Sequence, residues 1–395
     1  MTVLNSCGPL LLLSLLAATV KASLIPDTEY SFENFIIDFE RSYDSAEYAV
    51  RQRIFEENLQ KILQHNNHDK SSYKLGINQW ADHAPGEVHM GYDKSFATTA
   101  TSRRRALQVD AEEEHPLPIT IEPVASLPSS VSYAHIATPI KNQGMCGSCW
   151  AFASSAVLES HVALATSVPY ELSPQALVSC VNNTMHCGGD GGCQGATAEL
   201  AFDLVKKRGM VEEWEFGYRE ENGEDVPSCG LEKAVNKNGF WKKSVVGIED
   251  YVVLPSNNYT VLMNVIAKMG PVAVSVACHP WLLYHSGVFY SPLSEGKSAT
   301  DLNHLVVLEG YGTDTETGED YWLVRNSWGP RWGEGGYIRL KRVGEEECAY
   351  DRTPADGSAC TLDPDGNPIE PDDSLICGNS GILFETVIPV GGYLL

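Results

Sequence analysis

One short stretch places a cysteine in a setting suited to nucleophilic chemistry. Gly144, Gly147 and Ser148 predict a tight turn, and residues 150–165 predict a helix because alanine, leucine and glutamate dominate them. Cys149 therefore stands where a loop becomes a helix, next to unpaired backbone N–H groups and the positive end of the helix dipole. This setting favours the thiolate, and it predicts a nucleophile rather than a buried structural cysteine.

A thiolate nucleophile needs a base, and the base needs a group that orients it. His304 opens a short apolar run that ends in glycines, and Asn326 ends a second apolar run, so both runs predict buried strands. A histidine at the start of one strand and an asparagine at the end of a later strand can face the same cleft. For His304 taken alone, the alternative is a hydrogen-bonded core histidine.

These residues resemble the papain family of cysteine peptidases, and within it the cathepsin L-like group. The resemblance rests on Gln143, on the Cys-Gly-Ser-Cys-Trp run that contains Cys149, on His304, and on the Asn-Ser-Trp-Gly run at Asn326. It implies that Cys149 is the nucleophile, that His304 is the general acid and base, and that Asn326 orients the imidazole. Gln143 matches the oxyanion-hole side chain, which would act with the backbone N–H of Cys149.

The resemblance also implies a substrate cleft and its lining. The residues assigned to this cleft are Gly195, Ala196, Ser275, Leu305, Trp328 and Trp332. Trp328 matches the indole that shields the Asn–His hydrogen bond from water, and Trp332 is its companion. Ala196 replaces a glycine of the family pattern, and Leu305 is expected to shrink the pocket for the side chain two residues before the scissile bond. We expect an apolar preference in that pocket.

The implied fold class is α+β, in the papain-like two-domain arrangement. Residues 127–240 read as a helical half and residues 241–395 as a half rich in strands and similar to a β-barrel, with the active-site cleft between them. Cys149 then lies on the helical side, and His304 and Asn326 lie on the β side. Residues 127–395 form the expected mature peptidase domain.

The region before residue 127 predicts a signal peptide and an inhibitory propeptide. Residues 10–18 form a short apolar run, which predicts a signal peptide over residues 1–22. The propeptide is expected over residues 23–126, as a small helical unit at about 30–93 followed by a linker. Apolar residues recur at helical spacing around 32–39 and 50–63.

Two motifs in this helical unit resemble those of cathepsin L-like propeptides. The ERFNIN motif is represented by Glu47, Arg51, Phe55, Asn58, Ile62 and Asn66. A Gly-x-Asn-x-Phe-x-Asp motif follows, with tryptophan in the phenylalanine position, at Gly76, Asn78, Trp80 and Asp82. The resemblance implies that the unit lies along the cleft in a direction that cannot be cleaved.

The linker holds Arg103, Arg104 and Arg105, which are either a processing site or solvated charge.

The predicted signal peptide indicates a secreted or lumenal protein, and in such a protein the cysteines are expected to form disulfides. By resemblance, Cys146 pairs with Cys193 and Cys180 with Cys229. Cys377 is expected to pair with Cys348 or Cys360, while Cys187 and Cys278 stay unassigned and one free thiol is expected. A zinc site at Cys180, His186, Cys187 and Cys193 is disfavoured against disulfides, so we expect no metal and no cofactor.

Residues 344–376 form an insertion rich in acidic residues and proline. It is expected to be a solvated surface excursion; the alternative is a cap on the cleft or a docking surface. Asn182 and Asn258 begin glycosylation sequons. The net charge of −24 argues against nucleic acids and anionic membranes as partners, and no segment is expected to insert into a membrane.

We therefore expect a secreted or lysosomal cysteine endopeptidase that forms a thioester on Cys149 and is made as an autoinhibited zymogen. The expected location is the lysosome, the vacuole or the extracellular space, and the expected state is a monomer. Its partners would be peptide or protein substrates, its own propeptide and cystatin-type inhibitors. The alternatives are an exopeptidase with a capped cleft, a non-catalytic binding protein of the same family, and an inhibitor that acts through its released propeptide.

Overall fold

The computed structural model describes residues 23–68, 71–88, 90–91, 117–184, 187–219, 223, 226–344, 347–352 and 374–395. The predicted signal peptide, the arginine run at 103–105 and most of the acidic insertion lie outside these residues. The helices are α1 Phe32–Asp38, α2 Ser45–Asn66, α3 Cys149–Thr166, α4 Pro174–Cys180, α5 Ala198–Arg208, α6 Tyr259–Lys268 and α7 Lys297–Thr300.

The strands are short and most of them follow α5. They are β1 Tyr73–Leu75, β2 Val131–Ser132, β3 Val246–Gly247, β4 Asp250–Val253, β5 Val272–Val276, β6 Tyr284–Phe289, β7 His304–Thr313, β8 Asp320–Arg325, β9 Tyr337–Lys341, β10 Cys348–Asp351, β11 Ser374–Cys377, β12 Thr386–Val390 and β13 Tyr393–Leu394. The main sheet has the order β1-β6-β9-β8-β7-β5-β12-β4, and β2 pairs with β7.

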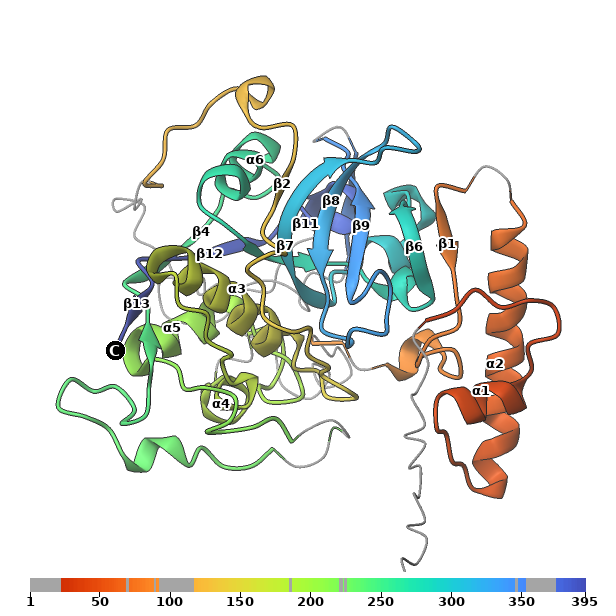
Figure 1. The fold of residues 1–395 in the computed structure, drawn as a ribbon, viewed down its shortest axis with the longest axis horizontal. Coiled ribbons are helices and arrows are strands. Elements are labelled where there is room, and N and C mark those ends of the chain that lie inside the picture. The colour runs from red at the N-terminus through yellow and green to blue at the C-terminus, as the bar shows by residue number, and fades with distance from the viewer. Residues whose placement is uncertain are drawn as a thin grey trace, which may run out of the picture.

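We call the described residues from 23 to 91 the N-terminal unit. Helices α1 and α2 pack through aromatic and aliphatic side chains into their own core, which includes Phe35, Phe55 and Ile62. The side chain of Asp44 caps α2 by accepting hydrogen bonds from two backbone N–H groups of its first turn. Figure 1 shows both helices at one end of the molecule, with β1 between them and the sheet. Strand β1 pairs antiparallel with β6, so this unit contributes an edge strand to the main sheet.

The helical half is built around α3. Thirteen of the 18 residues of α3 are buried, including all of its first twelve, as expected for a helix whose N-terminal part is covered on all sides. Helices α4 and α5 and strand β7 pack against it. The left-handed residue Ser167 (φ 61°) ends the helix.

Strands β5 and β7 form the boundary between the two halves. They pair antiparallel, with Ser275 opposite Leu305. Because side chains alternate across a strand, Val274 and Val306 belong to the core of the β half, whereas Ala273 and Leu305 belong to the core around α3. This alternation places the start of β7 directly beside the start of α3.

The predicted fold class agrees with the structure, and the β half also contains a helix that the sequence analysis did not identify. Residues 259–268 form helix α6, which packs on the sheet beside β7. The β-branched residues of this segment lower its helix propensity, so the sequence pattern did not indicate a helix. The Asn258 side chain caps the helix by accepting a hydrogen bond from the N–H of Val261 at 3.0 Å.

Candidate active site

Cys149 is the first residue of α3, as the sequence predicts. Its sulfur accepts a hydrogen bond from the backbone N–H of Leu305 at 3.1 Å. Leu305 is the second residue of β7, so this contact joins the helical half to the β half at the sulfur atom. The side chain of Cys149 is completely buried.

His304 and Asn326 form a hydrogen-bonded pair, and His304 directly precedes Leu305, whose N–H contacts this sulfur. The Nε2 atom of His304 lies 2.8 Å from Oδ1 of Asn326. The backbone N–H of Ser327 also donates to this Oδ1 atom, at 2.8 Å, which identifies it as the amide oxygen and an acceptor. Nε2 must therefore carry the proton, and Nδ1 is the unprotonated nitrogen of the neutral ring. Within the described part of the chain, buried Nδ1 has no hydrogen-bond partner.

The predicted tryptophans cover this pair. The Trp328 ring stacks on the His304 ring with centroids 5.1 Å apart and an interplanar angle of 29°. Trp332 meets Trp328 edge-on at 5.0 Å and donates from Nε1 to the carbonyl of Leu282. Both indoles are fully buried, so they exclude water from the His304–Asn326 hydrogen bond.

Gln143 is fixed at both ends of its amide. Its Nε2 atom donates to the carbonyl of Cys146 at 3.0 Å, and its Oε1 atom accepts from the hydroxyl of Ser327 at 2.6 Å. An amide nitrogen carries two hydrogens, so one of them stays available beside the loop that leads to Cys149. This is the arrangement that an oxyanion donor requires: a buried N–H on a side chain that does not rotate.

The end of the N-terminal unit lies directly on Cys149. A Cβ atom at position 91 would stand 1.9 Å from the Cys149 sulfur, so only glycine fits there. A Cβ atom at Gly195 would stand 2.2 Å from the Gly91 carbonyl oxygen, and one at Gly147 would stand 2.5 Å from the carbonyl oxygen of Met90. The backbone of residues 90–91 therefore lies over the Cys149 sulfur and against the loops at Gly147 and Gly195, which belong to the helical half. Sequence reasoning placed the unit along the cleft but did not single out these two residues.

This coverage reverses the charge state that the sequence predicts for Cys149. Burial raises the pKa of the Cys149 thiol to about 12, against the opposing effect of hydrogen bonds from the N–H groups of Leu305, Gly91 and Trp150. Burial also lowers the pKa of His304 to about 4, although its bond to Asn326 acts the other way. The prediction of a thiolate is therefore wrong for this form: at neutral pH both groups are uncharged.

The residues predicted to line the substrate cleft fall into two groups. Gly195 contacts residue 91, and the adjacent Ala196 is fully buried. Ser275 and Leu305 are cross-strand neighbours, as a shared pocket requires. Sequence reasoning missed Glu385, which lies just before β12: its Oε2 atom accepts a hydrogen bond from the Ser275 hydroxyl at 2.6 Å.

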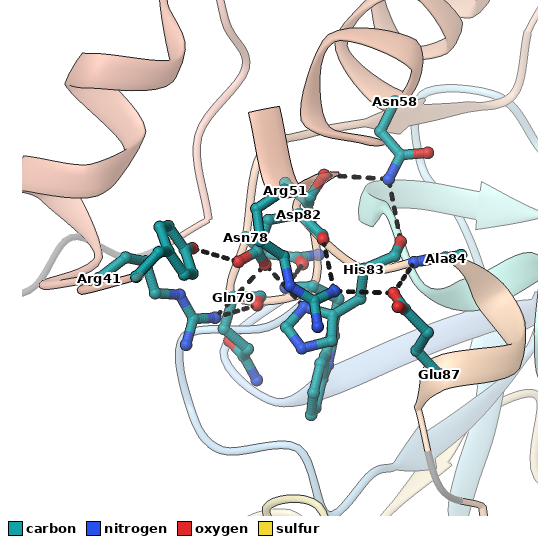
Figure 2. A network of polar contacts seen from close by, with 12 residues as sticks. Arg41, Arg51, Asn58, Asn78, Gln79, Asp82, His83, Ala84 and Glu87 are labelled. Carbon is teal, nitrogen blue, oxygen red and sulfur yellow. Dashed lines mark hydrogen bonds and ion pairs between the residues drawn. The ribbon is translucent and has the colours of Figure 1, made fainter. Parts of the chain in front are cut away.

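The ERFNIN residues connect the long helix α2 by hydrogen bonds to the segment that follows it. Arg51 donates to Glu87 at 2.8 Å and to the carbonyl of Asp82 at 3.1 Å. Asn58 donates to the carbonyls of Ala81 and His83 at 3.0 and 3.1 Å, and both interactions are visible in Figure 2. These side chains hold residues 81–87 in a fixed loop on the surface of α2.

The second motif carries the contacts from this loop to the rest of the chain. Asn78 donates to the carbonyl of Leu282 at 2.8 Å, and the Trp80 ring meets Trp328 edge-on at 6.0 Å. Figure 2 shows Arg41, Asp82 and His83 gathered in one network of polar contacts.

Asp82 is the buried carboxylate of this network. Although its burial favours the protonated form, the hydrogen bond and charge of His83, the charge of Arg41 and the hydroxyl of Tyr43 hold the pKa of Asp82 below its usual range.

The cysteines pair as the resemblance implies. Disulfides join Cys146 to Cys193 and Cys180 to Cys229, and Cys377 pairs with Cys348, one of the two partners left open. Cys187 is also disulfide-bonded. Among the described cysteines, Cys149 and Cys278 are reduced, so one free thiol accompanies Cys149. In the described ranges we find no cluster of His, Cys, Asp or Glu that could hold a metal ion.

Comparison with known proteins agrees with this geometry. Residues 127–356 match the family described as "Papain family cysteine protease", which is more than half of the chain. The chain belongs to the papain family of cysteine proteases. Residues 32–88 match the "Cathepsin propeptide inhibitor domain (I29)", so the N-terminal unit is the inhibitory propeptide of a zymogen.

The relatives cover both parts of the chain. It is 35% identical to "Cathepsin L" of Sarcophaga peregrina over 350 residues, which are 85% of this chain and 95% of that protein. It is 36% identical to "Cysteine protease 1" of rice (Oryza sativa subsp. japonica) over 305 residues, but this alignment spans 75% of this chain and only 56% of the rice protein.

Solved structures of two precursors are similar to most of the chain. Digestive procathepsin L 3 of Tenebrio molitor larval midgut aligns with a TM-score of 0.65 and 26% identity, over 91% of this chain and 97% of that chain. A recombinant stem bromelain precursor aligns with a TM-score of 0.64 and 27% identity, over 91% and 97%. The descriptions of both structures name precursors, which agrees with the arrangement of residues 90–91 over Cys149. Within the part that the structure describes, every helix is too short or too polar to cross a membrane.

Proposed function

We propose that Cys149, His304, Asn326 and Gln143 are the catalytic residues of a cysteine endopeptidase, and that the N-terminal unit keeps them inactive. The observation that carries this proposal is the state of the His304 ring. Its Nε2–H is committed to Asn326, and its Nδ1 atom is a buried acceptor without a partner in the described part of the chain. A ring held in this tautomer can take the thiol proton of Cys149 on Nδ1 and return it to a leaving group.

Acylation follows from these roles. After the N-terminal unit has left, the proton of Cys149 moves to Nδ1 of His304, and the thiolate attacks the carbonyl carbon of the scissile peptide bond. The carbonyl oxygen gains a negative charge, which the backbone N–H of Cys149 and the free hydrogen of Gln143 Nε2 stabilise. The C–N bond then breaks, His304 gives its proton to the leaving nitrogen, and a thioester remains on Cys149.

Deacylation uses the same groups in the reverse order. Neutral His304 removes a proton from a water molecule, the resulting hydroxide attacks the thioester carbon, and the thiolate of Cys149 leaves as the peptide acid is released. Trp328 and Asn326 keep the ring plane fixed through both steps, because the stacked indole and the Nε2–H bond prevent its rotation. The proposed catalytic side chains are held in place on both the helical half and the β half. This argues against a non-catalytic member of the family.

The pocket formed by Ser275 and Leu305 is proposed to accept the side chain two residues before the scissile bond. The side chain of Leu305 supports an apolar preference in this pocket. The carboxyl group of Glu385, bonded to Ser275, adds a group that can pair with a cation. Substrates with leucine and with arginine at this position, compared at equal concentration, measure which of the two features dominates.

We further propose a protein of the secretory pathway, in a lysosome, a vacuole or outside the cell, which acts as a monomer and is open to cystatin-type inhibitors. The disulfides support an oxidising compartment. Asn182 is exposed, as a glycosylated residue must be, whereas the oxygen of Asn258 caps α6. Peptide mapping with and without glycosidase treatment tests both sequons.

The test of the proposed function is site-resolved labelling of the processed protein. A cysteine-directed epoxide should form one adduct on Cys149 and abolish hydrolysis of a dipeptidyl coumarin amide. Cys149→Ser should lower kcat/KM by more than about 10⁴-fold without lowering the Tm, because it removes the nucleophile and little else. Full hydrolysis by Cys149→Ser, or an adduct on Cys278 that alone abolishes activity, would overturn the assignment.

A further inference from the structure

A cavity of about 320 Å³ lies between the N-terminal unit and the peptidase domain. The unit lines it with Phe39, Arg41 and Gln79, and the peptidase domain lines it with Asn142 and residues 328–331. This volume is at the lower end of the range for small-molecule pockets, which is about 300–1,000 Å³. Among the lining residues, the catalytic steps described above give a role only to the tryptophan at position 328.

The cavity is positively charged in a strongly negative protein. Among the described residues, its lining contains two guanidinium groups, those of Arg41 and Arg331, and no carboxylate. Arg331 is exposed, and its side chain forms no ion pair or hydrogen bond with the described part of the chain. Because the whole chain has a net charge of −24, two arginines in a lining without an acidic residue reverse the sign of the charge locally. Such a cavity favours an anion over a cation.

Arg41 is only partly neutralised by its own neighbours. Its Nη2 atom donates to the carbonyl of Gln79, an interaction that Figure 2 shows, and lies 3.7 Å from Oδ1 of Asp82. Asp82 is shared, because His83 and Tyr43 also bond to its carboxyl group. The Nε atom of Arg41 is buried and has no partner among the described residues, and its Nη1 atom bonds to none of them. A guanidinium has five N–H donors, so Arg41 keeps donors for a ligand.

The peptidase domain adds a neutral donor beside these charges. Oδ1 of Asn142 accepts a hydrogen bond from the N–H of Gly144 at 3.1 Å, which identifies it as the amide oxygen. The Nδ2 group of this exposed side chain donates to none of the residues that the structure describes. Three donor groups therefore border one cavity from both sides of the interface, and Phe39 and Trp328 add aromatic walls.

We propose that this cavity binds a tetrahedral oxyanion, a phosphate or sulfate group, and that the bound anion stabilises the zymogen. Guanidinium groups bind such anions through paired, charge-assisted hydrogen bonds. A carboxylate has only two oxygen atoms, so it can engage fewer of the donors at one time. The cavity is larger than one inorganic ion, so it also has room for the organic part of a phosphate ester beside the aromatic walls.

The stabilising effect follows from the position of the cavity at the interface. Arg41 belongs to the N-terminal unit and Arg331 to the peptidase domain, so the complete site exists only while the unit is docked. A ligand that binds only the docked form shifts the docking equilibrium by a factor of 1 + [L]/Kd. The anion concentration would then control the release of the unit, which goes beyond the proposed function.

The first experiment measures binding to the full-length Cys149→Ser proenzyme, which lacks the proposed nucleophile and is not processed by it. Inorganic phosphate at about 10 mM, compared with sodium chloride at the same ionic strength, should raise the Tm by about 2 °C. Arg331→Gln should reduce this shift to less than half, and Arg331→Lys, which keeps the charge but loses the paired donors, should retain part of it.

Arg53→Gln is the matched control, because Arg53 is an exposed arginine of α2 that pairs with Glu57 and does not line the cavity. It should show the full shift. A general stabilisation by phosphate acts on all variants alike, so only the difference between variants reports on the site.

Two further ligands define the chemical class. Glycerol phosphate at the same concentration distinguishes the sources of the group: a shift equal to that of inorganic phosphate assigns the free ion, and a larger shift assigns an ester. Acetate should give less than half of the phosphate shift. In the wild-type proenzyme, phosphate should slow the appearance of coumarin amide hydrolysis by about tenfold, with processed enzyme in the same buffer as the control for direct inhibition.

The contrary outcomes are distinct. Equal shifts in phosphate and chloride, or an undiminished phosphate shift in Arg331→Gln, would overturn the site. A shift in acetate as large as that in phosphate would overturn the tetrahedral class. Both results would leave the proposed function intact. Conversely, a failure of the processed enzyme to hydrolyse the coumarin amide would overturn the proposed function, while the binding experiment needs no activity and would stand.

Discussion

Two buried polar clusters of this zymogen have opposite charge states. In the N-terminal unit, Asp82 keeps its charge because His83 and Arg41 face it, and its pKa is lowered although the side chain is buried. At the proposed catalytic centre, Cys149 and His304 lose theirs: burial raises the pKa of the thiol to about 12 and lowers the pKa of the imidazole to about 4.

Burial and the neighbouring groups therefore act separately on the pKa of a buried side chain. Around Asp82, the groups that oppose desolvation include charges, whereas the groups that oppose it at Cys149 are backbone N–H donors. The inhibitory unit therefore contains a charged, pH-sensitive contact, and the catalytic centre beneath it stays neutral for as long as the unit excludes water. Autoinhibition in this protein combines a steric block at Gly91 with suppression of the thiolate.

The largest effect is expected from the catalytic cluster. Asn326→Ala removes the acceptor that fixes the His304 tautomer and ring plane, so kcat of the processed enzyme should fall by about 100-fold or more, while KM changes little. Steady-state kinetics on a coumarin amide measure both constants. An unchanged kcat would show that Trp328 alone orients the ring.

The next effect sharpens the contrast between steric and electrostatic inhibition. Gly91→Ala introduces a Cβ atom 1.9 Å from the Cys149 sulfur, and overpacking of this kind costs about 2 kcal/mol. The proenzyme should therefore activate about 30-fold faster at neutral pH, as measured by the appearance of coumarin amide hydrolysis.

Gly86→Ala is the matched control, because a Cβ atom at Gly86 meets nothing within 4 Å. Equal activation rates for the two variants would contradict the close passage of residue 91 over the sulfur.

A smaller effect concerns the pH response. The lowered pKa of Asp82 means that its charge stabilises the docked unit above its ordinary pKa of about 4, and that this contribution is lost as the pH falls through the depressed value. Asp82→Asn should activate about tenfold faster at neutral pH, and its activation should rise less steeply on acidification.

Activation rates measured across the acid range test this response, with Glu57→Gln as a control for an exposed carboxylate on α2. A variant that kept the steepness of the wild type would remove Asp82 from the pH response.

Local signals predicted much of this molecule from the sequence. The loop-to-helix step at Cys149, the strand starts and ends at His304 and Asn326, and the spacing of the ERFNIN residues depend on neighbours in the chain and on a strong family resemblance. The sequence does not reveal features that arise from contacts between distant segments. Met90 reaches Cys278 only because the N-terminal unit docks on the β half, and Glu385 reaches Ser275 only through the pairing of β5 with β12.

The charge state of Cys149 shows the same limit. A cysteine at a helix start predicts a thiolate when water and the helix dipole are considered alone. The raised pKa in the zymogen comes from complete burial under residues more than fifty positions earlier in the chain, which no pattern around Cys149 encodes. The prediction of a thiolate at Cys149 therefore applies to the site after the N-terminal unit has been removed.

In the zymogen, the N-terminal unit suppresses the thiolate of Cys149. The most direct measurement is the pH dependence of its alkylation by iodoacetamide, with mass spectrometry resolving Cys149 from Cys278, before and after removal of the unit. We predict that Cys149 of the zymogen reacts only above about pH 10, and that the processed enzyme reacts across the neutral range. The same pH midpoint in both forms would contradict the claim.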